Sequence, residues 1–216
     1  MQLSIKHNNN GGGKPAISVI VIDSRSNSNP DWVEKCLNSV KDQTLQNIEL
    51  IVLNNLEKKY SIGKLYNQGV EAAEADWVYF LGDDDYVSPD FFASLVAFID
   101  RYTEDYVVAC STYSTFFDDE KREMSINTMA PFGAFRREFL LKNKFDETLD
   151  RYIDAEMYKR VGEMGKVEGV HKARVCRWHF GYYYRQHGGM VSGKKIIKPN
   201  EGITNERKDI KPVPTN

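Results

Sequence analysis

Three short apolar runs constrain the fold more than any other feature of this sequence. They span residues 17–22, 49–53 and 77–81, and each is followed at once by polar residues. Runs of β-branched and other apolar residues with almost no polar interruption are typical of strands that are covered on both faces, as in a parallel sheet. Amphipathic stretches at 30–40 and 62–75 separate the runs. This alternation predicts an α/β fold with a Rossmann-like, mostly parallel central sheet flanked by helices.

The pattern after the third run is weaker but still predicts further elements. Pro89 begins a helix that continues through Ile99, and residues 154–165 have the apolar spacing of another helix. Strands are expected at 106–110 and 167–170, a turn entering a helix at 132–142, and a strand or an ordered loop at 176–184. The expected organisation is a flexible lead at 1–14, a single domain at 15–193 and an extended tail at 194–216.

Composition is that of an ordinary globular domain. The chain has 216 residues, of which 41% are apolar and 28% charged, so a core can form without disulfides or metal staples. Cys36, Cys110 and Cys176 are widely spaced and are expected to be free thiols in a reducing compartment. No apolar run approaches the roughly 20 residues of a membrane span, and the first residues lack the apolar stretch of a signal peptide. We therefore expect a soluble cytoplasmic protein.

Charge is distributed unevenly along the chain. Residues 1–157 carry a formal net charge of −10, and residues 158–216 carry one of +8. This excludes a uniformly basic nucleic-acid binder but allows a local site where basic side chains meet an anion such as a diphosphate. For the lysines after Gly193, a basic segment that simply faces water is the alternative.

Polar residues follow each of the three predicted strands. They are Asp23-Ser24-Arg25, Asn54-Asn55 and Asp83-Asp84-Asp85. Ligands of open α/β sheets bind beyond the carboxyl ends of the strands, so these three tips are expected to share one crevice. Successive carboxylates repel one another unless a cation neutralises them, and oxygen ligands of this kind suit Mg²⁺ or Mn²⁺. The alternative is a solvated acidic turn that caps the helix after Pro89.

Several separated segments, taken in order, resemble family 2 glycosyltransferases of the GT-A fold. The resemblance covers roughly residues 16–189. Its segments are ISVIV at 17–21, CLNSV with QT at 36–44, NIELIV at 47–52, NQG at 67–69, the strand and acid cluster at 77–89, GAFRRE at 133–138 and FDE at 145–147. Each segment alone is weak, and their order and spacing carry the resemblance.

The resemblance implies a single GT-A domain that binds a nucleotide-diphosphate sugar. The implied donor-binding residues are Asp23, Ser24, Asn55, Lys64, Asn67, Asp83 and Arg185. The implied acceptor-side residues are Gly133, Ala134 and Arg136, and the implied ligands of Mn²⁺ or Mg²⁺ are Asp84, Asp85 and His187. The sequence departs from the family at Asn54-Asn55, where two aspartates are usual, and at Gly82, where the acid motif usually begins with aspartate. The base of the nucleotide and the register of the metal ligands therefore stay open.

The three aspartates cannot all bind a metal equally if the segment is extended. Side chains alternate along an extended backbone, which predicts that Asp83 and Asp85 point together and that Asp84 points away. Asp84 is the favoured ligand, followed by Asp85.

Glycosyl transfer with inversion needs a carboxylate that takes the proton of the acceptor hydroxyl. The family has a Glu-Asp pair at the start of a helix after FDE, and Ile153-Asp154 stands there in this sequence, so Asp154 is the candidate general base. An N-cap role for Asp154 is the alternative, and the two roles are compatible. The segment YRQH at 184–187 resembles a basic loop that closes over the diphosphate. Arg185 would clamp phosphate oxygens there, and His187 would bind metal or phosphate.

These features predict a metal-dependent inverting glycosyltransferase of the hexosyltransferase kind. The acceptor hydroxyl would belong to a glycan, a lipid-linked molecule or a protein. One alternative keeps this chemistry but transfers the sugar to modified bases of DNA, held by the basic region after Tyr158. Another alternative is a non-catalytic scaffold that binds a nucleotide sugar. The sequence leaves the sugar and the oligomeric state open.

Overall fold

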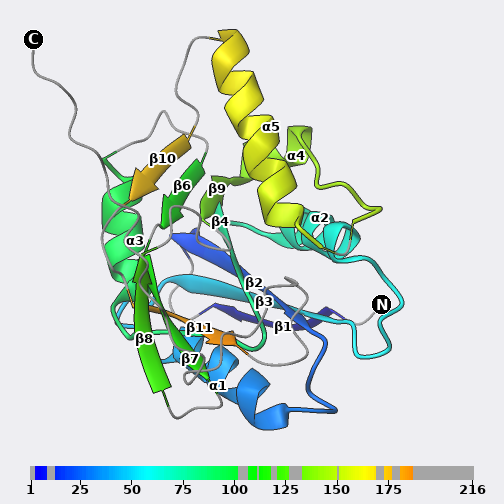
Figure 1. Cartoon of the computed structure of the whole chain (residues 1–216), viewed down its shortest axis with the longest axis vertical. Coiled ribbons are helices and arrows are strands. Elements are labelled where there is room, and N and C mark those ends of the chain that lie inside the picture. Colours follow the sequence, from blue (N-terminus) through cyan, green and yellow to red (C-terminus); the bar gives the residue numbers. More distant parts are fainter. Residues whose placement is uncertain are drawn as a thin grey trace, which may run out of the picture.

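The computed structural model describes residues 3–8, 13–101, 107–110, 112–117, 121–126, 133–149, 151–168, 173–176 and 181–186. Within them, a seven-stranded mixed sheet lies at the centre of the molecule (Figure 1). Its strands are, in spatial order, β1 (Leu3–Asn8), β3 (Ile48–Asn54), β2 (Ile17–Asp23), β4 (Trp77–Leu81), β9 (Ala134–Arg136), β6 (Val107–Cys110) and β10 (Ala173–Cys176). β2 is parallel to β3 and β4, whereas β1 and β9 are antiparallel to their neighbours. The three predicted strands are thus confirmed as the parallel centre of the sheet.

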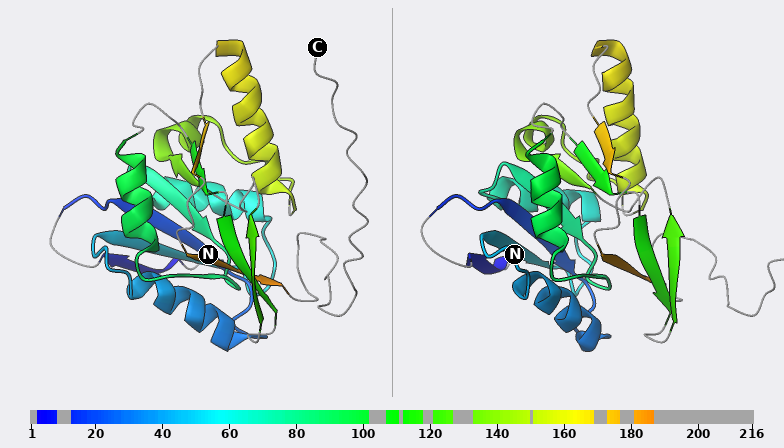
Figure 2. Two further views of the ribbon diagram at one scale, coloured as in Figure 1. Left: turned by 60° about the vertical axis from the view of Figure 1, so that its left-hand side comes forward. Right: turned by 90° about the vertical axis from the view of Figure 1, so that its left-hand side faces the viewer.

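A four-stranded sheet lies beside the central one (Figure 2). Its strands are, in spatial order, β5 (Tyr86–Val87), β11 (Tyr182–Gln186), β7 (Thr112–Phe117) and β8 (Lys121–Ile126). Gly181 lets β11 approach β5, since its φ is +83° and a Cβ there would lie 2.0 Å from the Ser88 hydroxyl oxygen. β11 therefore returns to the residues that directly follow the acid cluster.

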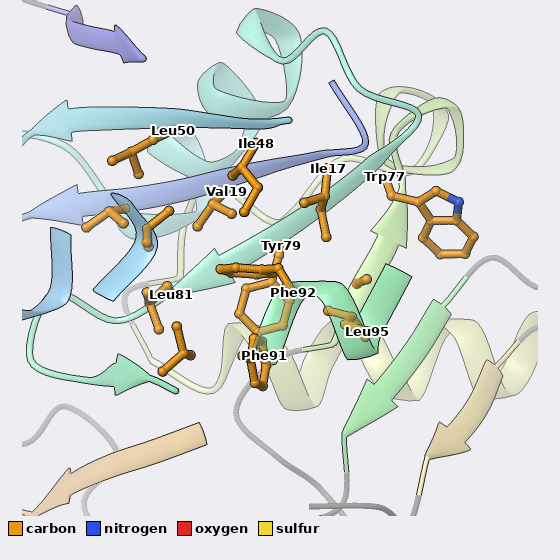
Figure 3. Packing of buried hydrophobic residues seen from close by; sticks show 14 of the residues in the cluster. Ile17, Val19, Ile48, Leu50, Trp77, Tyr79, Leu81, Phe91, Phe92 and Leu95 are labelled. Atoms are coloured by element: carbon orange, nitrogen blue, oxygen red, sulfur yellow. The ribbon is translucent and has the colours of Figure 1, made fainter. Parts of the chain in front are cut away.

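Five helices of the described residues cover both faces of the central sheet. They are α1 (Pro30–Lys41), α2 (Ile62–Ala72), α3 (Phe91–Ile99), α4 (Arg137–Lys142) and α5 (Ile153–Glu168). The side chains of β2 alternate between the faces, so Val19 packs with residues of α1 and α3 while Ile20 packs with residues of α2, α4 and α5. On the first face, Tyr79 lies edge-on to Phe91 and Phe92, with ring centroids 5.4 Å apart (Figure 3).

Two details fix the parallel strands against their neighbours. Gly69 lets α2 lie directly on β2, because a Cβ there would come 2.8 Å from a methyl carbon of Ile20. A buried polar clasp joins β2 to β3, in which the Ser18 hydroxyl donates to the Glu49 carboxylate at 2.5 Å. The same carboxylate oxygen accepts the N–H of Glu74 at 2.8 Å, and the N–H of Ala75 donates to the Ser18 oxygen at 3.1 Å. The turn before β4 is thereby attached to both strands.

The structure corrects several expectations. β1 is a strand within the segment expected to be a flexible lead, and it pairs with β3. β9 is a strand where only a turn was expected before α4, and the β7–β8 hairpin was not predicted at all. α5 continues through Val167 and Glu168, where the start of a strand was expected. The predicted tail at 194–216 lies outside the described residues. Among the described helices, none has the length and hydropathy needed to cross a membrane.

Candidate active site

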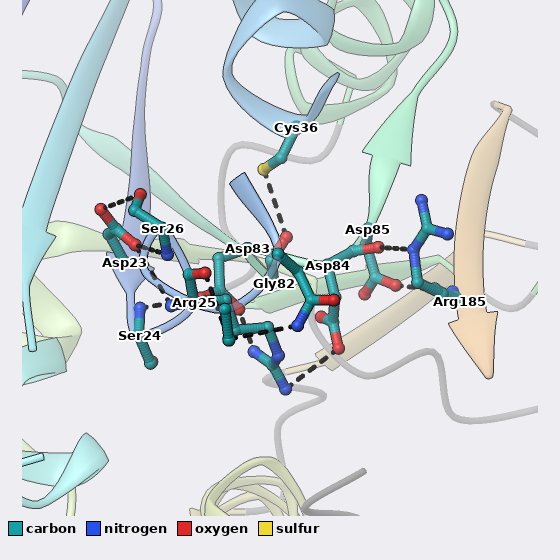
Figure 4. Close-up of polar contacts among 12 residues, drawn as sticks. Asp23, Ser24, Arg25, Ser26, Cys36, Gly82, Asp83, Asp84, Asp85 and Arg185 are labelled. Carbon is teal, nitrogen blue, oxygen red and sulfur yellow. Dashed lines mark hydrogen bonds and ion pairs between the residues drawn. The ribbon is translucent and has the colours of Figure 1, made fainter. Parts of the chain in front are cut away.

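The candidate site is centred on the turn that follows β4, residues 82–85, which we call the acid turn (Figure 4). The backbone closes into a turn because the N–H of Asp85 donates to the carbonyl of Gly82 at 3.1 Å. Asp83 and Asp84 consequently face one cation, Arg25, whereas Asp85 is bonded inside the molecule. The prediction that Asp83 and Asp85 point together is therefore wrong, since it assumed an extended segment.

The tip of β2 holds the acid turn from one side. The N–H of Ser24 donates to Asp83 Oδ2 at 2.8 Å. Arg25 bridges two carboxylates, because its Nη1 donates to Asp83 Oδ1 and its Nη2 lies 3.1 Å from Asp84 Oδ2. Two of the predicted donor-binding residues, Ser24 and Asp83, are thus brought together at the carboxyl end of the parallel strands.

Strand β11 holds the acid turn from the other side. Asp85 accepts the N–H of Arg185 at 2.8 Å and the hydroxyl of Tyr182 at 2.5 Å. Arg185 Nε donates to the carbonyl of Asp84 at 2.9 Å, and its guanidinium stacks on the Trp32 ring at 4.4 Å from the centroid. Arg185 is only 1% exposed. The expectation that it clamps a diphosphate is corrected, because these contacts place it behind the turn as a support.

Burial and mutual repulsion perturb the carboxylates of the acid turn. Burial raises the pKa of Asp83 to about 6; the Arg25 guanidinium opposes this rise and the charge of Asp84 adds to it. The pKa of Asp85 is also raised, first by burial and then by Asp84. For Arg25, burial lowers the pKa, but the charges of Asp84 and Asp83 outweigh it and raise the pKa above its ordinary value. Burial, with a smaller contribution from the charge of Asp84, therefore disfavours the ionised forms of Asp83 and Asp85.

Gly82 and Cys36 shape the turn from beneath. A Cβ on Gly82 would lie 2.9 Å from Asp85 Oδ2 and 3.0 Å from Asp84 Oδ1, so a larger residue would require these carboxylates to shift. The Cys36 thiol donates to the Gly82 carbonyl at 3.2 Å. Burial, followed by the charges of the acid turn, raises the pKa of this thiol well above its ordinary value and keeps it protonated.

The acid turn suits an open site for a divalent cation, in which the protein supplies only some of the metal's ligands. The described residues contain no group of three His, Cys, Asp or Glu side chains arranged as a closed metal site. The turn nevertheless already holds a cation, the guanidinium of Arg25, between Asp83 and Asp84. The Asp84 side chain is 15% exposed, and hard oxygens at a rim suit Mg²⁺ or Mn²⁺ that completes its ligands with phosphate and water. Asp85, expected as the second ligand, is instead directed towards β11.

The charges of both the acid turn and the candidate base act on Tyr66. This buried residue of α2 packs against Phe80, at 4.4 Å between ring centroids. Its pKa is raised well above the ordinary value, first by burial, then by the charge of Asp154, and then by the charges of the acid turn. Asp154 and the acid turn therefore act on the same hydroxyl. Asp154 lies in the first turn of α5, which begins at Ile153, so the N-cap alternative is wrong.

Asp23 and Asn55 shape the neighbouring loops. The Asp23 carboxylate accepts from the N–H and the hydroxyl of Ser26, at 2.9 and 2.6 Å. The Asn55 amide donates to the Tyr60 carbonyl at 3.0 Å, and the Asn55 N–H donates to the Asp23 carbonyl at 2.8 Å. Lys64 lies on the first turn of α2, with its ammonium 5.2 Å from the centroid of the Tyr60 ring. Donor contacts by Asp23, Asn55 and Lys64 stay predictions.

Asn67 braces α2 against the loop that precedes α5. Its amide donates to the Phe145 carbonyl and to Glu147 Oε1, both at 3.0 Å, and its oxygen accepts the N–H of Phe145 at 2.8 Å. Asn67 is buried. The expectation that it binds the donor is corrected, because its amide is used for this brace.

The predicted acceptor-side residues spread along β9 and the residue before it. Arg136 pairs in register with Trp77 and stacks on its ring at 4.8 Å from the centroid. This places Arg136 at the start of β4, the end opposite to the acid turn, so its expected place in the site is wrong. Ala134 pairs with Tyr79 in the middle of β4, and Gly133 precedes it on the side of the acid turn.

One predicted ligand, His187, lies outside the described residues. Sequence reasoning did not assign the roles of Arg25, Tyr66, Tyr182 and Trp32. The position of Arg25 directly after β2 was the available signal, since that tip was already expected in the crevice. The other three roles depend on contacts between residues far apart in sequence.

This fold is that of the GT-A class. Among solved structures, Staphylococcus aureus TarS residues 1–349 in complex with UDP-GlcNAc has a TM-score of 0.60 and 19% identity, covering 81% of this chain and 60% of that one. The complex of TarS 1–349 with UDP has a TM-score of 0.58 and 20% identity, covering 79% and 60% of the two chains. At these identities the likeness shows a shared fold.

Residues 55–161 match the family described as glycosyl transferase family 2, and the chain belongs to this family. EpsH of Bacillus subtilis (strain 168), which bears the name of a glycosyltransferase, is 22% identical over 169 residues. That match covers 68% of this chain and 47% of EpsH. The chain therefore spans about half the length of the curated relative it matches.

Proposed function

We propose that this chain is a glycosyltransferase that moves a sugar from a nucleotide-diphosphate donor to an acceptor hydroxyl. The observation that carries the proposal is the acid turn, attached to the tip of β2 at the carboxyl edge of the parallel strands. This is where ligands of open α/β sheets bind. The donor class is supported by TarS, which shares the fold and was solved with UDP-GlcNAc.

We further propose that transfer depends on Mn²⁺ or Mg²⁺ held by Asp84 and Asp83. The support is that these two carboxylates already bind a guanidinium. When bound, the divalent cation supplies Lewis-acid stabilisation of the leaving diphosphate. Tyr182 and Arg185 keep the turn in shape from behind, through their hydrogen bonds to Asp85.

Asp154 is the proposed general base for transfer with inversion. Its charge and the charges of the acid turn act on the same buried Tyr66 hydroxyl, which supports a common site. In this reaction the acceptor oxygen bonds to the anomeric carbon, the bond from that carbon to the diphosphate breaks, and Asp154 takes the hydroxyl proton.

Donor binding is tested first, by thermal unfolding with nucleoside diphosphates and their sugar derivatives. Each is measured with Mn²⁺ and with EDTA, because a ligand that binds the native state stabilises it by mass action. We expect a Mn²⁺-dependent rise in Tm for one nucleotide, with UDP the first candidate. No shift with any nucleotide would contradict the donor site.

Two variants separate the proposed metal ligand from the proposed base. Asp84→Asn is expected to lose the Mn²⁺-dependent part of donor binding, whereas Asp154→Asn is expected to keep donor binding and lose transfer by at least about a hundredfold. Matched controls are Asp42→Asn, an exposed carboxylate at the end of α1, and Glu163→Gln, an exposed one on α5. Equal donor affinity in Asp84→Asn and Asp42→Asn would contradict the metal assignment.

The sequence alternatives become outcomes of the same measurements. Donor binding without transfer or hydrolysis would favour the non-catalytic scaffold. Salt-sensitive DNA binding would favour modified DNA bases as acceptor. Much of the basic region that would hold DNA lies outside the described residues, so this alternative rests on charge alone.

A further inference from the structure

Arg25 occupies the place in the acid turn where a divalent cation would be held. Its two terminal nitrogens contact different carboxylates, Asp83 through Nη1 and Asp84 through Nη2. A planar guanidinium that bridges two carboxylates is a strong and directional pair. Arg25 thus neutralises part of the charge that burial and repulsion make unfavourable.

A divalent cation and this guanidinium cannot use the same oxygens. Asp84 has the more exposed carboxylate of the bridged pair, at 15% against 4% for Asp83, and its Oδ2 already lies 3.1 Å from Arg25. Two cations brought to one carboxylate repel each other at short range. Binding of the metal through Asp84 therefore competes with Arg25 and favours its withdrawal.

The remaining contacts let the turn keep its shape when Arg25 withdraws. Asp83 still accepts the N–H of Ser24, and Asp85 still accepts from Tyr182 and Arg185. The Arg25 side chain is 18% exposed, so it has access to solvent. The exchange therefore moves one side chain and leaves the backbone of the acid turn in place.

The geometry points to Arg25 as the resident counter-cation of the acid turn, exchanged for the divalent cation when the donor site is loaded. This inference rests on the metal-dependent donor site proposed above. Arg25 is a positioning residue in this scheme, because it preserves the arrangement of Asp83 and Asp84 until the metal binds. It also lowers the affinity for metal alone, since the metal must compete with a tethered cation.

The exchange is observed directly by NMR of arginine side chains during a Mg²⁺ titration without nucleotide. We expect the Arg25 Nε–H resonance, assigned by its loss in Arg25→Met, to shift or broaden as Mg²⁺ binds. The Arg185 Nε–H resonance is the internal control, because its hydrogen bond to the Asp84 carbonyl is not exchanged. Binding of Mg²⁺ that leaves the Arg25 resonance unchanged would overturn the exchange.

Metal affinity gives a second measurement, by Mn²⁺ titration without nucleotide. We expect Arg25→Met to bind Mn²⁺ about tenfold more tightly than wild type. The affinity of Arg25→Lys should lie between the two, because lysine keeps the positive charge but lacks the planar guanidinium that contacts two carboxylates at once. The control Lys35→Met removes a cation that lies over the Tyr86 ring and should change the affinity less than twofold. Near-UV circular dichroism establishes that each variant is folded.

The outcomes distinguish this inference from the proposed function. Unchanged or weaker Mn²⁺ binding by folded Arg25→Met would overturn the exchange, as would the absence of Mn²⁺ binding to wild type and variant alike. Transfer of sugar in EDTA would then leave the transferase proposal standing without a metal. Tighter Mn²⁺ binding by Arg25→Met without a response to any nucleotide would support the exchange and contradict the donor site.

Discussion

Asp85 is a buried carboxyl group that accepts hydrogen bonds from two groups of β11, and these bonds offset only part of the burial that raises its pKa. The Tyr182 hydroxyl and the Arg185 N–H supply these bonds at 2.5 and 2.8 Å. The same pair adds to the connection between the two sheets, where β11 also pairs with β5 next to the acid turn. A single hydroxyl therefore affects both the local charge balance and the attachment of β11.

Removal of that hydroxyl should be costly. We expect Tyr182→Phe to lower the free energy of unfolding by about 1–3 kcal/mol, because a buried carboxylate loses a donor while the ring is retained. Urea unfolding at pH 7 measures the change. Tyr152→Phe is the control, since Tyr152 is 62% exposed and its loss should stay within about 0.5 kcal/mol. Equal effects of the two substitutions would show that the bond to Asp85 contributes nothing measurable.

Helix α2 is placed by two glycines as much as by its apolar face. Gly69 allows contact with β2, and Gly63 allows contact with the loop before α5, where a Cβ would lie 2.1 Å from the Asp146 carbonyl oxygen. The N–H of Gly63 also faces the Leu149 carbonyl, at 3.4 Å. The loop that leads to Asp154 is thus positioned by the start of α2.

Gly63 of α2 and Gly162 of α5 make a matched test of this packing. We expect Gly63→Ala to destabilise the chain by about 2 kcal/mol or more, because backbone atoms would have to move to admit the methyl group. Gly162→Ala, in α5 with nothing within 4 Å of the added carbon, should stabilise it by up to about 1 kcal/mol. Thermal unfolding of both variants measures the difference, and a neutral Gly63→Ala would refute the close approach.

The central strands could be predicted at the element scale, but the edges of the fold could not. The runs at β2, β3 and β4 are apolar because both faces are covered, so their sequence alone reveals them. The hairpin of β7 and β8 mixes polar and apolar residues without a clear period, and β1 carries a lysine and a histidine. Such strands depend on a neighbour already in place, which no local pattern records.

The site shows the same division. The position of the acid turn followed from the order of strand and loop, whereas its geometry did not, because closure between Gly82 and Asp85 replaced an extended segment. The support from Arg185 and the bridge by Arg25 are contacts across long sequence distances. Residue type and spacing therefore predicted the position of the candidate site, and tertiary contacts decided which of its atoms face one another.

At the scale of the whole molecule, the candidate site joins distant parts of the chain. Ser24, Asp84 and Arg185 come from three separate strand ends or turns, and two sheets meet there. A ligand that contacts this site should stabilise the entire fold, because its binding is lost only when these parts separate.

Saturation of the site should therefore shift global unfolding. At a nucleotide concentration of about 100 times its Kd, with Mn²⁺ present, we expect a gain near 2.7 kcal/mol, or about 5–10 °C in Tm. Calorimetry in Mn²⁺ and again in EDTA measures the gain and its metal-dependent share. If the unfolding transition split in two, with one part insensitive to nucleotide, the chain would not unfold as a single cooperative unit.

The Ser18–Glu49 clasp also bears on how the sheet avoids misassembly. Two parallel apolar strands could pair in several offsets with similar burial, since one β-branched residue resembles the next. An offset of one residue would separate the Glu49 carboxylate from the Ser18 hydroxyl and the Glu74 N–H, and would leave a charge in the core without those donors. The clasp thus specifies the register of β2 against β3. It disfavours wrong pairings more than it stabilises the right one.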